Sequence, residues 1–374
     1  MAKNENKEYQ MLDQSVREFA ARQLAPHLPD NDRYPAGEFF DQALNKAMEL
    51  DFFHVMLPED LNGWGGRITP LGLILKAVAE TDASLGAILL ANAVAQDIIR
   101  LAGGGEILKE MVNGAQTPRE LLLACPLLTN PDDEGIPLSA ESRDGGYALS
   151  GRMDYVVPAP LVKKALVPAR TVAGPGYDFF LVDLEQPGVT VEGPVLGMGL
   201  HACPAADLTF DRAKARLIGS PGQGPAVFNQ AMTRTLPAAA AVSCGLMRGS
   251  LKEAVQYSRK RSQGGRRIID WSELRLLLAD MALKTRTAET LLDRAWQAAD
   301  EEAAGWVEDA FTAAVYSLEQ AGQVASDGIQ ALGGYGYTKD FFQERRFRDA
   351  QHLRCVFGNA SLRRMSYVKQ CLNW

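Results

Sequence analysis

Residues 330–350 read QALGGYGYTKDFFQERRFRDA, and the interpretation of the whole chain starts from this stretch. Two adjacent glycines, Gly333 and Gly334, follow a helical pattern and precede a cluster of charged residues. Because glycine has no Cβ, it lets a backbone approach a ligand closely and leaves its N–H groups open to an anion. The same spacing suits a glycine that ends a helix before a solvated charged turn, so both interpretations stay open.

The composition limits the class of protein. A chain of 374 residues is long enough for a large core and for more than one domain, and 47% hydrophobic residues is ordinary for a globular protein. The formal net charge of −7 argues against nucleic acid as the main partner. The N-terminal segment MAKNENKEYQ is polar, and we expect no apolar run long enough to span a bilayer, hence no membrane segment.

Cysteine and histidine are scattered along the chain. The five cysteines are an odd number and form no CxxC pair, and the four histidines do not cluster. This spacing predicts neither a disulfide framework nor a metal site. It is typical of a protein in a reducing compartment, so we expect a cytoplasmic location.

The spacing of hydrophobic residues along the sequence divides the chain into three parts. Residues 1–118 and 221–374 place apolar side chains at spacings of three and four, which predicts helices. Residues 119–220 contain short apolar runs that predict strands: LLLAC (121–125), YALSGRMDYVV (147–157), KKALVPAR (163–170) and DFFLVDL (178–184). We predict an α+β fold, mainly α, with an N-terminal helical domain, a middle β domain and a C-terminal helical bundle. The long apolar stripes of the bundle indicate that it also buries a face against other subunits.

This order of parts, together with the GGYGY and RFRDA segments, resembles the acyl-CoA dehydrogenase family over almost the whole chain. The resemblance implies a C-terminal four-helix bundle and FAD bound between the bundle and the β domain. It also implies an acyl-CoA thioester substrate and an electron-transferring flavoprotein as the electron acceptor. In the family a carboxylate takes the α-proton while a hydride leaves the β-carbon for the flavin, so the chemistry needs a positioned base.

In the family FAD is held by two chains, and this sequence keeps the residues that reach the neighbour's cofactor. The matching positions are Arg261, Gln263, Gln330, Gly333 and Gly334. The fork of an arginine suits the FAD pyrophosphate. Gly264 stands where the family has Phe. Taken alone, Arg261 also fits a surface arginine in a run of basic residues.

The part of the site that would hold this chain's own cofactor departs from the family. The segment LTNPDDEGI (128–136) keeps Thr129, but the glycine-rich turn has become Asp132, Asp133 and Glu134. Three carboxylates would raise the energy of a nearby phosphate.

The flavin-ring positions of the family, Trp and Thr, are Tyr155 and Val157 here. Tyrosine can still stack, but valine cannot replace the hydroxyl donor. Without the resemblance, the two would be read as alternating strand residues.

The catalytic carboxylate is also missing. Counting on from RFRDA places Phe357 at the position of the usual Glu, and the alternative position early in the C-terminal domain is Thr235. Neither side chain is a base at neutral pH. Glu344 and Asp349 lie nearest in sequence, but both match positions where the family keeps structural acids, so we expect ion pairs there.

This pattern leads to the hypothesis of a half-site subunit. The chain would complete the FAD site of a second, catalytically complete acyl-CoA dehydrogenase chain, as in heteromeric members of the family that act on steroid side-chain or other bulky CoA thioesters. Three alternatives stay open: a self-sufficient dehydrogenase with an atypical base, a flavin monooxygenase on the same fold, and a non-enzymatic scaffold.

Overall fold

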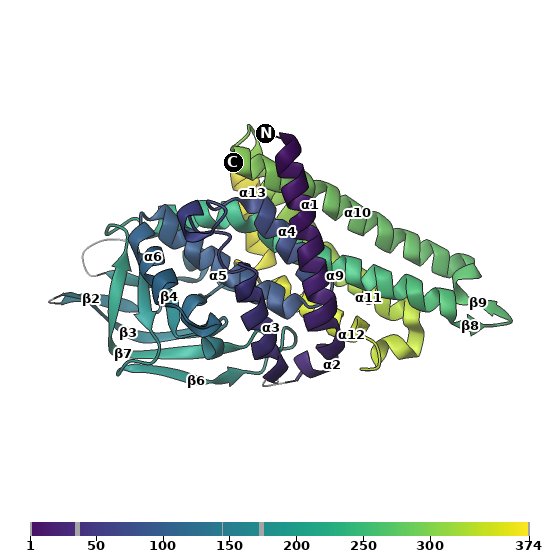
Figure 1. Cartoon of the computed structure of the whole chain (residues 1–374), viewed down its shortest axis with the longest axis horizontal. Helices are drawn as coiled ribbons and strands as arrows, with labels where there is room; N and C mark the ends of the chain where they lie inside the picture. The colour runs from purple at the N-terminus through teal and green to yellow at the C-terminus, as the bar shows by residue number, and fades with distance from the viewer. Residues whose placement is uncertain (1, 34–37, 144, 172–175, 373–374) are drawn as a thin grey trace.

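A computed structural model describes residues 2–33, 38–143, 145–171 and 176–372. A β domain lies at one end of the molecule, a pair of long helices extends to the other end, and most N-terminal helices lie between them (Figure 1). The predicted three-part, mainly helical architecture is confirmed. The N-terminal helices are α1 (Ala2–Phe19), α2 (Leu28–Asn31), α3 (Glu38–Glu49), α4 (Ile68–Ala79), α5 (Ala83–Leu101), α6 (Gly105–Gly114) and α7 (Pro118–Leu121).

Helix α5 is the centre of the N-terminal part. It begins after Asp82, whose Oδ1 accepts a hydrogen bond of 2.8 Å from the backbone N–H of Ser84 and so caps the helix. With 19 residues and a mean hydropathy of 1.3, α5 is long and apolar enough to cross a bilayer, so the expectation that no such run exists was wrong. Its most apolar window is 89% buried inside the structure, as in a core helix.

The β domain is a single sheet that closes on itself. Strands β4, β2, β3, β7 and β5 pair in a ring, because β4 also pairs with β5, and β1 and β6 add to β4 and β7. The strands are β1 (Leu123–Ala124), β2 (Ser139–Arg143), β3 (Gly146–Val156), β4 (Lys164–Thr171), β5 (Asp178–Asp183), β6 (Val189–Val195) and β7 (Ala205–Ile218). The short helix α8 (Pro131–Glu134) precedes β2. Closure leaves few strand edges, and the buried apolar residues of this domain belong to one continuous core with those of the helices.

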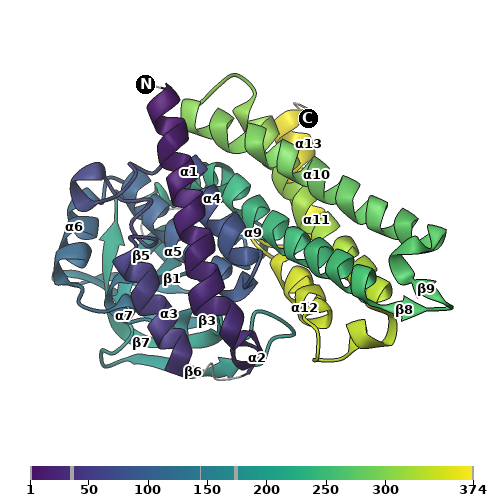
Figure 2. The same cartoon turned by 45° about the vertical axis from the view of Figure 1, so that its right-hand side comes forward.

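The C-terminal part consists of long helices that run side by side (Figure 2). It contains α9 (Gly224–Lys260), α10 (Ser272–Glu301), α11 (Trp306–Leu332), α12 (Gln343–Leu353) and α13 (Ala360–Cys371), with the small hairpin β8 (Ser262–Gln263) and β9 (Arg266–Arg267). Small residues let α9 approach α4 closely, since a Cβ on Gly245 would lie 2.3 Å from the carbonyl oxygen of Lys76. The shorter α12 and α13 pack on α11 and complete the bundle.

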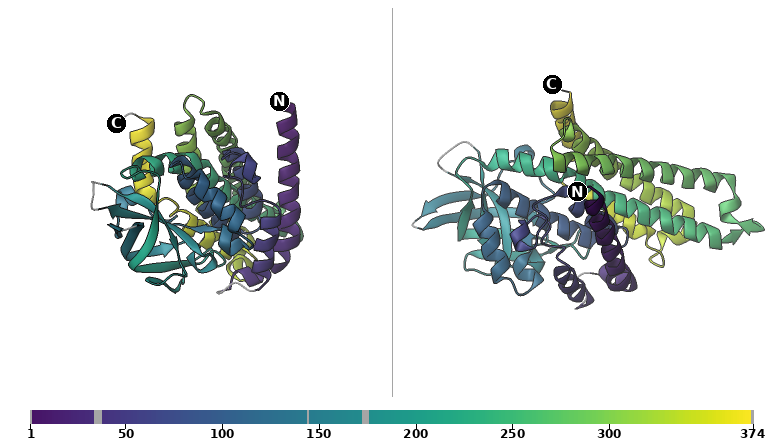
Figure 3. Two further views of the ribbon diagram at one scale, coloured as in Figure 1. Left: turned by 60° about the vertical axis from the view of Figure 1, so that its left-hand side comes forward. Right: turned by 45° about the horizontal axis from the view of Figure 1, so that its top comes forward.

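The hairpin end of the bundle lies far from the β domain (Figures 1 and 2, and the right-hand view of Figure 3). All five cysteines are free thiols. In the part of the chain that the structure describes, no group of three or more histidine, cysteine or acidic side chains could hold a metal ion.

Candidate cofactor-binding site

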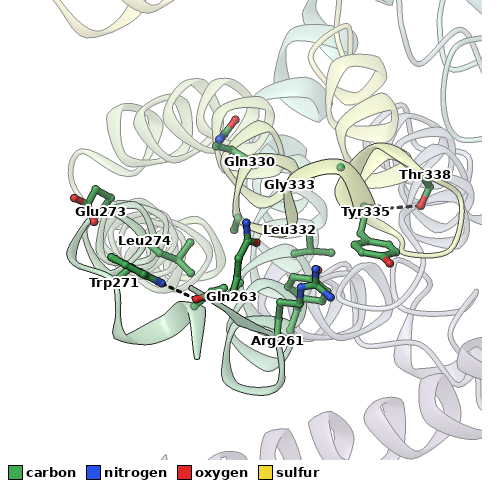
Figure 4. Close-up of a pocket in the computed structure, with 14 residues that line it drawn as sticks. Arg261, Gln263, Trp271, Glu273, Leu274, Gln330, Leu332, Gly333, Tyr335 and Thr338 are labelled. Atoms are coloured by element: carbon green, nitrogen blue, oxygen red, sulfur yellow. Dashed lines mark hydrogen bonds between the residues drawn. The ribbon is translucent and has the colours of Figure 1, made fainter. Parts of the chain in front are cut away.

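A cavity of about 660 Å³ opens at the hairpin end of the bundle (Figure 4). It is formed by the end of α9, the β8–β9 hairpin, the start of α10, the end of α11 and the 3₁₀ segment Gly333–Tyr337. All five residues predicted to face a neighbour's FAD line it: Arg261, Gln263, Gln330, Gly333 and Gly334. The structure therefore brings together two stretches that lie far apart in sequence, although their role towards FAD stays a prediction.

Arg261 is the cation of this cavity. Its backbone N–H donates to the carbonyl oxygen of Tyr257 at 2.9 Å, and this bond closes the last turn of α9. The guanidinium carbon lies 5.6 Å from the centroid of the Tyr335 ring. No carboxylate among the described residues forms an ion pair with Arg261. An arginine held by an aromatic face without a counterion is available to an anion.

Gly333 ends helix α11, and Gly333 and Gly334 both line the cavity. Gly333 has φ 60° and ψ −138° and follows the last residue of α11, so the helix-stop interpretation is correct. A Cβ on Gly333 or Gly334 would meet no atom within 4 Å, which leaves open space beside the backbone. Gly336 differs, because its Cβ would lie 2.4 Å from the carbonyl oxygen of Ile329. The two interpretations of the glycines are therefore compatible.

The charged residues after the glycines form a buried network rather than a solvated turn. Arg345 donates to Asp82 at 3.0 Å and lies 3.6 Å from Asp349, and all three side chains are almost fully buried. Arg348 donates to Glu344 at 2.7 Å. The expectation that Glu344 and Asp349 serve in ion pairs is confirmed, and neither carboxylate is free to act as a base.

A second group of charged side chains, Asp32, His201 and Arg348, links the N-terminal part to α12. Asp32 accepts hydrogen bonds from Arg348 at 2.6 Å and lies 3.0 Å from Nδ1 of His201. Burial by itself raises the pKa of Asp32, but the hydrogen bonds from His201 and Arg348 outweigh it, and the pKa falls well below its ordinary value. The hydrogen bond to Asp32 raises the pKa of His201 in turn.

The residues that the resemblance assigns to this chain's own flavin line a separate cavity of about 480 Å³ between the β domain and α12. Its lining consists of Leu128, Thr129, Tyr155, Met198, Gln351, His352 and Cys355, with no carboxylate. Both residues predicted for this chain's own site, Thr129 and Tyr155, are present. The hydroxyl of Thr129, however, donates to the carbonyl oxygen of Pro126 at 3.1 Å.

Val157, at the position of the family's hydroxyl donor, does not reach this cavity. Its side chain is buried, and its backbone N–H and carbonyl oxygen both pair with Cys125. Tyr155 has φ 62°, an uncommon backbone conformation for a tyrosine, and its N–H donates to Asp207 at 2.8 Å.

The two positions that the family resemblance assigns to the base are closed. Phe357 is buried, and its N–H donates to the carbonyl oxygen of Leu127 at 2.8 Å. Thr235 is fully buried, and its hydroxyl donates to the carbonyl oxygen of Ala231 at 2.7 Å. Neither side chain can take a proton from a ligand.

One carboxylate of the acidic turn at residues 132–134 is engaged in hydrogen bonds, which the sequence did not suggest. Asp132 accepts from the hydroxyl of Tyr177 at 2.9 Å and from the amide of Asn229 at 3.1 Å. Its charge therefore stabilises the junction between α8, the β domain and α9. The side chains of Asp133 and Glu134 lie outside the described residues.

Sequence reasoning missed His352. Its Nδ1 donates to the carbonyl oxygen of Gly199 at 2.9 Å, and its ring centroid lies 5.8 Å from that of Tyr155. Burial lowers the pKa of His352, so the ring is neutral at pH 7 and Nε2 is its remaining acceptor. His352 lies one residue before the end of α12, no spacing in the sequence singles it out, and only packing shows that it meets Tyr155.

Comparison with known proteins identifies the class. Residues 6–115 match the family model described as the acyl-CoA dehydrogenase N-terminal domain, and residues 222–372 match that of the C-terminal domain. The chain belongs to the acyl-CoA dehydrogenase family.

The sequences of its relatives align with nearly the whole chain. It is 28% identical over 367 residues to the caffeyl-CoA reductase–Etf complex subunit CarC of Acetobacterium woodii, covering 95% of this chain and 96% of that protein. It is 27% identical over 373 residues to benzylmalonyl-CoA dehydrogenase of Aromatoleum aromaticum, covering 97% of each. The structure of butyryl-CoA dehydrogenase from Megasphaera elsdenii matches with a TM-score of 0.87 at 23% identity, covering 97% of this chain and 98% of that one, and shows the same fold.

Membership of the family confirms FAD as the cofactor, and the two cavities fit it unequally. The hairpin-end cavity offers the uncommitted cation of Arg261 and open space beside Gly333 and Gly334, which suits a phosphate group close to the backbone. In the β-domain cavity the hydroxyl of Thr129 already donates to a backbone carbonyl oxygen, and Val157 has no hydroxyl, so Tyr155 carries the remaining hydroxyl among the lining residues. The residues that fit FAD are those at the hairpin end.

Proposed function

We propose that this chain is a half-site subunit of a heteromeric acyl-CoA dehydrogenase. It contributes Arg261, Gln263, Gln330, Gly333 and Gly334 to the FAD of a second chain, and that partner supplies the base and the acyl-CoA site. The observation that carries the proposal is the placement of these five residues in one cavity at the end of the bundle away from the β domain. From there they cannot close over the chain's own flavin region.

The state of that region supports the same proposal. Phe357 and Thr235 occupy the positions of the base, and both are buried. Glu344 and Asp349 are held in ion pairs. The contacts for a neighbour's cofactor are kept while those for the chain's own cofactor are lost, and random decay has no reason to separate them in this way.

The partners follow by analogy. The relative CarC is named as a subunit of an Etf complex, and we extend an Etf-type electron acceptor to the complex proposed here. The partner's substrate would be an acyl-CoA thioester, with steroid side-chain and other bulky acyl groups as the first to try. A cytoplasmic location is part of the proposal.

The test is the FAD content of the chain alone and when co-expressed with a candidate partner, a catalytically complete acyl-CoA dehydrogenase chain from the same organism. Purified alone, the chain should hold almost no FAD, whereas the co-purified pair should hold about one FAD per pair of chains. A lone protein with about one FAD per chain, or a pair that does not co-purify, contradicts the proposal.

One observation favours a second candidate, the self-sufficient dehydrogenase with an atypical base. His352 places a neutral imidazole in the β-domain cavity, where Nε2 could accept a proton. This candidate predicts flavin in the lone chain and reduction of ferricenium with an acyl-CoA, abolished by His352→Asn. If the same substitution leaves the activity of the pair unchanged, the imidazole is structural.

A further inference from the structure

The segment between β6 and β7, residues 196–204, has no role in the proposed function, and one histidine joins it to the rest of the molecule. His201 lies in this segment, with 24% of its side chain exposed. Asp32, the residue that follows α2, faces it from the N-terminal part, and Arg348 of α12 donates to the same carboxylate. The β domain, the N-terminal helices and the bundle are therefore linked at this histidine.

Both ring nitrogens of His201 face oxygen atoms that accept hydrogen bonds. Nδ1 lies 3.0 Å from Oδ1 of Asp32 and 3.1 Å from the carbonyl oxygen of the same residue. Nε2 lies 3.2 Å from the carbonyl oxygen of Gly197. A neutral imidazole carries one N–H and would turn a lone pair towards one of these oxygens, whereas an imidazolium donates from both nitrogens. The geometry is therefore that of the charged form.

The groups around His201 also favour the charged form. Among the described residues, Asp32 faces it from the end of α2, and Arg348 and His352 face it from α12. The hydrogen bond to Asp32 raises the pKa of His201 and outweighs both its burial and the charge of Arg348, which lower it. His352 adds no charge of its own, because burial lowers its pKa.

The two halves of the segment are held by different groups. The second half is anchored to α12, where the N–H of Leu200 donates to Asp349 at 2.6 Å. The first half contains Leu196, whose side chain is 79% exposed, and Gly197. Within the described chain, the side chain of His201 is the only one that hydrogen-bonds to this first half. Loss of the proton would therefore act on the first half and leave the second in place.

We propose that His201 is a pH-sensitive clasp. As an imidazolium it ties Gly197 to the end of α2. As a neutral imidazole it keeps its N–H towards Asp32, turns a lone pair towards the carbonyl oxygen of Gly197, and releases Leu196 and Gly197. These two residues line a pocket of about 230 Å³ that also contains the buried thiol of Cys203. The inference does not depend on the proposed function, since it concerns contacts within this chain.

The pocket behind the clasp borders the β-domain cavity. Tyr155 and His352 line both. A Cβ on Gly197 would lie 2.8 Å from the hydroxyl oxygen of Tyr155 and 3.0 Å from Cε1 of His352, so the clasped backbone packs directly on these two side chains. Release of Gly197 would give solvent a second route to them.

Cys203 is a built-in reporter of the released form. It is 4% exposed, so N-ethylmaleimide should label it slowly while the clasp holds. The labelling rate would be measured by peptide mass spectrometry in the purified full chain and in His201→Gln, which carries no charge at any pH. The ratio of the two rates at one pH cancels the ionisation of the thiol.

This ratio should be low at about pH 6 and approach one at about pH 9, because the clasp is lost as the pH rises through the raised pKa of His201. The change should be about tenfold for each unit by which the clasp raises that pKa. A ratio that does not change with pH overturns the proposal. Cys244, fully buried in α9, reports unfolding of the whole chain, and equal acceleration at both cysteines also contradicts a local release.

The carboxylate that faces His201 provides a matched comparison. Asp32→Asn should label Cys203 faster at about pH 6 and move the midpoint of the pH profile down towards the ordinary pKa of histidine. Asp30→Asn, which changes an exposed carboxylate two residues away, should leave the profile unchanged. If Asp32→Asn labels as slowly as the unaltered chain, or if both variants shift the profile equally, the clasp is wrong.

Discussion

Arg261→Ala is expected to weaken FAD binding by the pair while leaving the fold nearly unchanged. Arg261 has no ion pair within the described chain, so its removal breaks none. Its contact with Tyr335 is exposed and contributes about 0.5–1 kcal/mol to stability. The hydrogen bonds expected between its guanidinium and the pyrophosphate contribute about 1.5–3 kcal/mol, which is about a 10- to 150-fold change in Kd.

The matched control is Arg259→Ala, which removes the same charge from the same basic run. Arg259 is exposed and does not line the cavity. Apo pair would be titrated with FAD, and the flavin absorbance and the thermal unfolding of each variant would be followed. If the two arginine variants bind FAD with equal affinity, a general electrostatic effect explains the result and the specific contact is refuted.

Three further predictions concern the closed and buried sites. Phe357→Glu should not create dehydrogenase activity in the lone chain. Its buried unpaired carboxylate should lower the free energy of unfolding by about 2 kcal/mol or more. Urea unfolding would measure this loss, with Phe357→Leu as the control. Asp349→Asn leaves Arg345 with one buried partner fewer and should lower stability by about 3 kcal/mol in the same assay; a loss below about 1 kcal/mol would show that the network contributes little. The pKa of His201 is raised above its ordinary value of 6.5, chiefly by the hydrogen bond to Asp32, so its stabilising effect is complete below that value and is lost as the pH rises through the raised pKa. The unfolding temperature should therefore fall more from about pH 6 to about pH 8 in the unaltered protein than in His201→Gln, and parallel profiles would exclude this linkage.

Local patterns in the sequence were enough for most of the fold. The period of the apolar residues identified the helical and β parts, and β1, β3, β4 and β5 lie within a few residues of the predicted runs, whereas β2, β6 and β7 match no predicted run. The ion pairs of Glu344 and Asp349 were also predictable, because the acids alternate with arginines on one short helix. The expectation of no apolar run long enough to span a bilayer failed at α5, whose 19 residues begin directly after the cap at Asp82.

The candidate site was predictable only in part. Arg261 and the paired glycines stand out by residue type, whereas Trp271 and His352 do not. A tryptophan at the start of a helix usually packs on its own hairpin, and only the missing Cβ of Gly264 reveals that its ring borders the cavity. Likewise, the hydroxyl of Thr129 donates to the backbone carbonyl oxygen of Pro126, and no pattern in the sequence predicts this hydrogen bond.

The sequence by itself determined the three-part architecture, because this depends on the periodicity of the apolar residues, and its motifs gave the resemblance to the family from which the residues predicted to face a neighbouring cofactor were assigned. The tertiary structure alone decided that those residues share one cavity at the hairpin end, that Phe357 and Thr235 are closed off, and that an indole forms the opposite wall. The physical reason is that a cavity is the space left between packed segments, and its position and charge follow from how α9, α10 and α11 meet, which no single segment encodes.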